Sequence, residues 1–296
     1  MEVCLLKNLM FNKKGDFIMK KIFVLASGRS GTKFLSGLFK HNVIKCVSKH
    51  EPRPDMFGRP INWFKNRKLD KIEEVFLYKK KKIDNYNADV YIETNHAFLK
   101  SFSDIAIKYY PDMKIIHLIR NPIKVARSEL NRQIWCDSFH MKLLIARYRP
   151  YYKDEEGVKH FRWALTWNEN IFKYENLKNL TPYQKYIAQW IEIENRAMKF
   201  LKKYHKSNDC FTLHAPNDLN NIDVLNDMFS FLNVKLKNGN IIIKGKRNKN
   251  KRKTIITNEE KEQCNYVFEN VSNRYLEIFK KEPYCNFDWI NDISLN

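Results

Sequence analysis

Short apolar runs recur along the chain, and longer stretches with helical spacing lie between them. The runs are rich in β-branched residues and only four to six residues long, which is typical of buried strands. Five strands are predicted, at residues 21–26, 43–47, 90–93, 114–119 and 210–214.

Between the strands, apolar residues recur at intervals of three and four, the spacing of one helical face. The clearest start signals are Pro122 and the capping sequence at 257–260. Helices are predicted at 31–41, 101–110, 122–130, 160–170, 182–203, 224–232 and from 257 to about 280. The alternation predicts an α/β fold, a single domain whose central, mostly parallel sheet is flanked by helices.

The domain is predicted to span residues 19–296. Residues 1–18 are expected to be a disordered leader or an artefact of an upstream start codon, because Met19 directly precedes the first strand. Two stretches, 52–87 and 135–158, break the alternation and are expected to be insertions or lids with little regular structure. We expect them over the carboxyl edge of the sheet, where α/β proteins bind ligands.

Composition excludes some classes of protein. The 296 residues are 44% hydrophobic, and 54 Lys and Arg against 33 Asp and Glu give a formal charge of +21. Such a charge attracts polyanions. The positive residues are spread throughout a chain that is also rich in Asn and Ile, as AT-rich coding sequence tends to be, so a solvated basic surface is favoured. There is no apolar run of about 18 residues and no signal peptide, so no transmembrane segment and a cytoplasmic location are predicted.

The cysteines indicate neither a metal site nor a disulfide scaffold. None forms a C-x-x-C pair, and no Cys/His cluster has the spacing of a zinc site. Free thiols in a reducing compartment are therefore predicted for all six: Cys4, Cys46, Cys136, Cys210, Cys264 and Cys285.

The sharpest motif is the segment 27–33, which joins the first predicted strand to a helix. Two glycines let its backbone turn with the N–H groups inward, and the helix directs the positive end of its dipole to the same point. Serine, threonine and basic side chains add donors. A phosphate site is therefore predicted from Ser27, Gly28, Arg29, Ser30, Gly31, Thr32 and Lys33.

The loop lacks the Walker A pattern, because its glycines are three apart and Thr-Lys-Phe follows the second. Strand 114–119 ends in Arg120 rather than in the Asp that holds Mg²⁺ in phosphoryl-transfer NTPases. Arg120 is instead a candidate bidentate phosphate ligand, and Ser128 two turns along the next helix is placed to join it. A second phosphate site is therefore predicted.

Together these motifs resemble the sulfotransferases that use 3′-phosphoadenosine 5′-phosphosulfate (PAPS). The text FVLASGRSGTKFLSGLF at 23–39 is similar to their 5′-phosphosulfate loop, with Arg29 in the cationic place and Lys33 replacing a second Thr. The text IIHLIRNPIKVARS at 115–128 is similar to their 3′-phosphate element, with Arg120 and Ser128 in the matching places. Weaker similarity extends the resemblance over residues 20–235.

The resemblance implies a P-loop NTPase-like fold, PAPS as donor, the bisphosphate PAP as product, no metal, and an acceptor that carries a hydroxyl. Glu51 lies where many members outside the cytosolic type have a general base, and His50 is the alternative. Arg29 and Lys33 would neutralise the leaving phosphate. Some relatives have a Lys after the third strand, a place that this chain leaves to His96.

Two interpretations of the basic run 244–253 remain open. It is either a solvated loop or, as in relatives, a cover over the 3′-phosphate and adenine, with Arg247 as the best candidate ligand. Two other functions also remain as alternatives: a P-loop nucleotide or sugar kinase, and a non-enzymatic polyanion-binding protein. No nucleic-acid motif is present. The aromatic and basic residues of 52–87 and 135–158 suit a sugar acceptor, an anionic glycan included.

Overall fold

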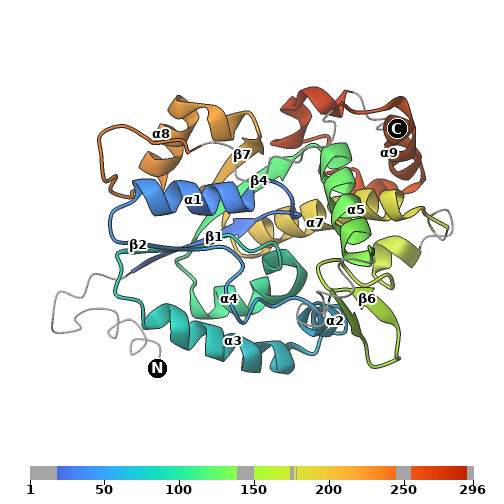
Figure 1. The fold of residues 1–296 in the computed structure, drawn as a ribbon, viewed down its shortest axis with the longest axis horizontal. Helices are drawn as coiled ribbons and strands as arrows, with labels where there is room; N and C mark the ends of the chain where they lie inside the picture. Colours follow the sequence, from blue (N-terminus) through green and yellow to red (C-terminus); the bar gives the residue numbers. More distant parts are fainter. Residues whose placement is uncertain (1–18, 139–149, 174–176, 178, 245–254, 292–296) are drawn as a thin grey trace, which may run out of the picture.

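The computed structural model describes residues 19–138, 150–173, 177, 179–244 and 255–291. Its centre is a sheet of five strands in the order β2-β3-β1-β4-β7, and every neighbouring pair is parallel (Figure 1). The strands are β1 Lys20–Leu25, β2 Cys46–Lys49, β3 Val90–Glu93, β4 Lys114–Arg120 and β7 Cys210–Ala215. The predicted α/β fold class is confirmed.

Alternate residues of each strand enter two separate cores, one on each face of the sheet. Ile22 and Val24 of β1 pack with α1 (Thr32–Asn42) and α8 (Ile222–Phe231), whereas Phe23 and Leu25 face the other side. That second, larger core is covered by α3 (Leu69–Asp84), α4 (Ser103–Tyr109) and α7 (Pro182–Lys203) (Figure 1). Burial on both faces explains why the strands are continuous apolar runs.

The remaining helices and strands come between these elements in the chain or follow them. A π-helix, Phe98–Phe102, follows β3, and α5 follows β4 with Pro122 at its first position. The bounds are α2 Arg59–Lys65, α5 Pro122–Asp137, β5 Tyr151–Lys153, β6 Lys159–Phe161 and α9 Asn258–Asn270. Strands β5 and β6 pair as an antiparallel hairpin.

Four predictions about elements are wrong, in whole or in part. The helix predicted at 160–170 is replaced by β6, turns and a 3₁₀ turn, because its dense apolar residues face the hairpin and α7 rather than one helical stripe. The second strand begins at Cys46 rather than at residue 43, because Val43 is the C-cap of α1 and Lys45 takes a positive φ of 42°. The last helix ends at Asn270, whose side chain donates a hydrogen bond to the backbone carbonyl of Tyr266 in the last turn.

The fourth correction concerns the two stretches expected to have little regular structure. Residues 52–87 hold two helices, α2 and α3, and 135–158 include the end of α5 and strand β5. The many charged residues of α3 made its apolar face hard to recognise in the sequence. Ile72, Phe76 and Ile83 form this face, and all three are buried. The predicted leader, 1–18, lies outside the described residues.

Candidate active site

The phosphate loop takes a backbone path that its two glycines permit. The φ angles of Gly28, Arg29 and Gly31 are 102°, 52° and 106°. A Cβ added at Gly28 would lie 2.8 Å from Oε1 of Glu129 and 3.1 Å from Nδ1 of His96, so only glycine fits. The loop is therefore pressed against two ionisable side chains from other elements.

Short hydrogen bonds hold the loop, and α1 leaves its own end open. The hydroxyl of Ser30 donates to the carbonyl of Gly28 at 3.0 Å and lies 3.2 Å from that of Ser27. Helix α1 begins at Thr32 without a side-chain cap and without an acidic residue in its first turn. Its N–H groups and dipole are thus available to an anion. Lys33 is exposed at the second helical position.

The fold brings together the three residues predicted to serve two phosphates. Nε of Arg29 donates to Oγ of Ser128 at 2.9 Å, and Nη1 of Arg120 donates to the carbonyl of Arg29. Nε of Arg120 is buried without a hydrogen-bond partner. Burial lowers the pKa of both arginines, and the charge of Arg29 lowers that of Arg120 further. Two desolvated cations and an unsatisfied donor favour a bound anion here.

The predicted base residues also meet. Glu51 lies two residues after β2 with a φ of 49°. Its Oε1 is 3.4 Å from Nε2 of His96 and 3.7 Å from Nε2 of His50. Nδ1 of His50 is 3.0 Å from the carbonyl oxygen of Thr94. Burial raises the pKa of Glu51 above its usual value, which makes the carboxylate a stronger base.

Lys100 is the residue that the sequence analysis missed. It lies on the π-helix, one turn beyond His96, and is fully buried. Its Nζ is 3.1 Å from Nδ1 of His96 and donates to the carbonyl of Trp163 at 2.8 Å. Burial lowers the pKa of Lys100 to about 7. A lysine within the apolar run 97–102 was the available signal.

Two further residues on α5 complete the cluster. Glu129 is fully buried and forms an ion pair with Arg132. The guanidinium of Arg132 lies over the rings of Trp163 and Phe161, 4.9 and 5.5 Å from their centroids. Both residues follow Ser128 on one helix, and neither belongs to a motif that sequence reasoning would single out.

A buried network fixes the turn that carries these groups. The carboxylate of Glu93, at the end of β3, accepts hydrogen bonds from Lys79 at 2.8 Å, Tyr91 at 2.7 Å and Asn95 at 2.9 Å. The side chain of Asn95 also accepts from the backbone N–H of Ala97 at 2.9 Å. His96 lies between these two residues, so its backbone is held firmly.

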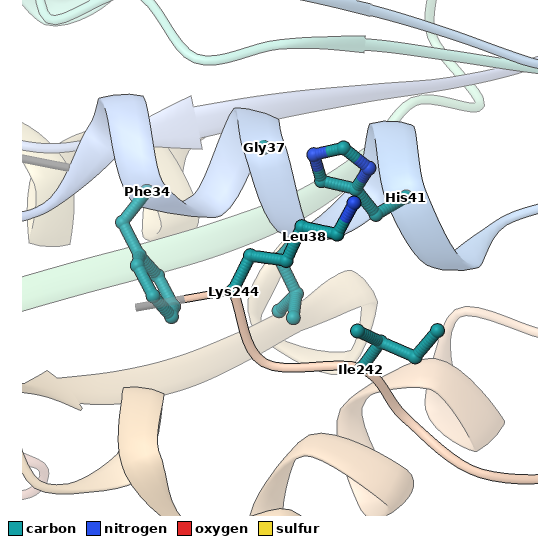
Figure 2. Close-up of a pocket in the computed structure, with 6 residues that line it drawn as sticks. All are labelled: Phe34, Gly37, Leu38, His41, Ile242 and Lys244. Atoms are coloured by element: carbon teal, nitrogen blue, oxygen red, sulfur yellow. The ribbon is translucent and has the colours of Figure 1, made fainter. Parts of the chain in front are cut away.

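The described chain reaches the basic run close to the phosphate loop. Asn42 at the end of α1 binds both backbone groups of Ile242, at 2.7 and 3.0 Å. Figure 2 shows the chain passing along α1 from Ile242, beside His41, to Lys244 near Phe34. Phe34 belongs to the first turn of that helix. Arg247 lies outside the described residues, and its role stays a prediction.

The described residues contain few other features that bear on function. Within these ranges, no three His, Cys, Asp or Glu side chains are grouped as a metal site requires, and the predicted lack of a metal stays a prediction. Five cysteines in the described ranges are free thiols: Cys46, Cys136, Cys210, Cys264 and Cys285. Among the helices that the structure describes, none has the length and apolarity of a membrane span.

No protein-family model and no curated protein matches the chain. Two solved structures resemble it. A sulfotransferase from Alicyclobacillus acidocaldarius is 16% identical, with 90% of this chain and 98% of that chain covered and a TM-score of 0.48. The sulfotransferase domain from the curacin biosynthetic pathway is 15% identical, with 73% and 75% covered and a TM-score of 0.37.

Proposed function

We propose that the protein is a sulfotransferase that moves a sulfuryl group from PAPS to an acceptor hydroxyl. One observation carries the proposal: an anion-binding loop lies directly against a carboxylate–imidazole pair. His96 lies next to both parts, since a Cβ added at Gly28 would be 3.1 Å from its Nδ1 and its Nε2 is 3.4 Å from Oε1 of Glu51. The reaction needs an anion site and a base at this separation.

The donor half binds and orients PAPS. The backbone N–H groups of 27–33 and Arg29 hold the 5′-phosphosulfate, and they stabilise the charge that grows on the leaving phosphate. Arg120 and Ser128 hold the 3′-phosphate. Arg120 already spans the two sites, because its guanidinium donates to the carbonyl of Arg29.

The base half removes the proton of the acceptor. Glu51 accepts the hydroxyl proton while the oxygen attacks sulfur in line, the new S–O bond forms, and the bond from sulfur to the 5′-phosphate oxygen breaks. PAP leaves with the electron pair of that bond. The raised pKa of Glu51 suits it to accept this proton, with His50 as the alternative base.

The acceptor enters from the side of residues 52–87. A hollow of about 320 Å³ lies there, and its lining includes an ion pair between Asp55 and Arg162. Its lining combines apolar side chains with two arginines: Arg53, Pro54, Asp55, Met56, Phe57, Pro60, Val75 and Arg162. Such a lining suits a sugar that carries an acidic group, and we propose a carbohydrate acceptor, an anionic glycan included.

Binding of the donor is the direct test. PAP should bind without added divalent metal. At 100 times its Kd it should stabilise the folded protein by about 2.7 kcal/mol, which raises the melting temperature. The rival functions give different results. A larger shift with MgATP than with PAP would indicate a kinase, and salt-sensitive binding to DNA with no PAP affinity would indicate a polyanion-binding protein. Radiolabelled PAPS with a panel of glycans then identifies the acceptor.

A further inference from the structure

The imidazole of His96 lies between two ionisable groups, one at each ring nitrogen. Its Nδ1 is 3.1 Å from Nζ of Lys100, and its Nε2 is 3.4 Å from Oε1 of Glu51. The ring is 2% exposed, and Nε2 is buried without a hydrogen-bond partner. The tautomer of a neutral ring decides which of the two neighbours faces the N–H group and which faces the unprotonated nitrogen.

Lys100 selects between the tautomers. An ammonium group has three protons and no lone pair, so it can only donate hydrogen bonds. Lys100 donates one to the carbonyl of Trp163 at 2.8 Å, and its other partner is Nδ1 of His96. Nδ1 must then accept, which leaves the ring proton on Nε2, because the partner of one ring nitrogen sets the protonation of the other.

The surroundings also keep the ring neutral. Burial, and then the positive charges of Lys100, Arg132, His50 and Arg29, hold the pKa of His96 well below its usual value. A neutral ring with its proton on Nε2 is a hydrogen-bond donor that faces Oε1 of Glu51. Donation to Oε1 would fix the carboxylate and leave its other oxygen for the acceptor hydroxyl.

We propose that Lys100 is a positioning residue that holds His96 in the Nε2–H tautomer, so that His96 orients the Glu51 carboxylate. The part concerning Glu51 rests on the proposed function, whereas the tautomer does not. Lys100 is 0% exposed, so it acts through His96 rather than by contact with the donor.

Four charged residues from three parts of the fold face Lys100: Glu51 after β2, Glu129 and Arg132 on α5, and Arg196 on α7. Burial outweighs them, and with a pKa of about 7 the ammonium is half deprotonated near neutral pH. A phosphosulfate or PAP in the loop beside His96 adds negative charge and favours the ammonium. The Nε2–H tautomer should therefore be most populated at pH below 7 or with PAP bound.

The first experiment needs no variant. Nitrogen NMR of the full chain with ¹⁵N-labelled histidine rings, at pH 6 with PAP, should show His96 protonated at Nε2 and unprotonated at Nδ1. The His96→Asn spectrum identifies the signal. A proton on Nδ1, or a mixture of tautomers, would overturn the proposal.

Kinetics provide the second experiment. Lys100→Met should give a mixture of tautomers and lower the turnover of sulfate transfer about 10- to 100-fold, less than the ~10⁴-fold cost of a wrong tautomer in a histidine that is itself the base. The Kd of PAP should change less than about twofold, and Lys100→Arg should restore the tautomer. Lys206→Met is the matched control, because Lys206 is a buried lysine that pairs with Asp209 elsewhere.

Two results would contradict the proposal: unchanged turnover with a single Nε2–H tautomer in Lys100→Met, or a loss of PAP affinity as large as the loss of turnover. A wild-type protein that binds no PAP but keeps the Nε2–H tautomer at pH 6 would refute the proposed function and support the role of Lys100 toward His96.

Discussion

The two halves of the candidate site balance their charges differently. On the donor side, Arg29 and Arg120 lie together, and neither forms an ion pair with a carboxylate among the described residues. On the base side, each carboxylate has a partner, since Glu51 faces the imidazole of His96 and Glu129 forms an ion pair with Arg132. The donor half therefore needs its ligand for neutrality, whereas the base half is already assembled without one.

The largest expected effect lies in the base half. Glu51→Gln keeps the shape of the side chain and removes its proton-accepting charge, so turnover should fall about 10²- to 10⁴-fold. The Kd of PAP should stay within about threefold, because Glu51 does not face the phosphates. Steady-state kinetics and calorimetry measure the two quantities.

The pH dependence of the same variant gives its control. The wild-type rate should fall at acid pH, as Glu51 takes up a proton at a pKa above its usual value, and this limb should vanish in Glu51→Gln. If Glu51→Gln stays active while His50→Asn is dead, the base is the histidine and the two halves are divided wrongly.

An intermediate effect is expected in the donor half. Arg120→Ala should cost about 1.5–3 kcal/mol of PAP affinity, the value of a hydrogen bond to a charged group. Adenosine 5′-phosphosulfate, which lacks the 3′-phosphate, should lose far less. Equal losses for the two ligands, measured by titration calorimetry, would show that Arg120 does not serve the 3′-phosphate.

A further effect is expected on stability without ligand. The pKa of Lys100 is about 7 in the folded protein, below its usual value of 10.5, so between these pH values the unfolded chain binds more protons. The free energy of unfolding of the wild type should therefore rise with pH across this window, relative to that of Lys100→Met. Denaturant titrations at pH 7 and pH 10 test this. Parallel changes in the two proteins would show that Lys100 is not desolvated.

The donor half could be predicted from the sequence because its residues lie in two continuous motifs. Segment 27–33 needs its glycines for positive φ angles, and Arg120 ends a strand that pairs directly with β1. Parallel strands bring their carboxyl ends to one edge of the sheet, so the local sequence after each strand was sufficient to place these groups together.

The base half could be predicted only in part. Glu51 and His96 follow two neighbouring strands, β2 and β3, and became candidates because the resemblance to sulfotransferases implies a base and a lysine at those two points. Lys100, Glu129 and Trp163 belong to a π-helix, a helix face and a turn that meet only in the folded chain. The helix wrongly predicted at 160–170 also gave no indication that the backbone carbonyl of Trp163 lies beside Lys100.

The carbonyl of Trp163 has a consequence for any attempt to redirect the protein to another acceptor. It binds Lys100, and the Trp163 ring packs on Arg132, yet the residue lies just beyond the β5–β6 hairpin, next to a segment expected to choose the acceptor. Specificity and proton transfer are thus not separable modules. A graft that exchanges residues 150–163 for those of another protein would disturb the base together with the pocket. A graft of 59–84 would spare Trp163 but would remove Lys79, which binds Glu93 in the network that holds the turn of His96.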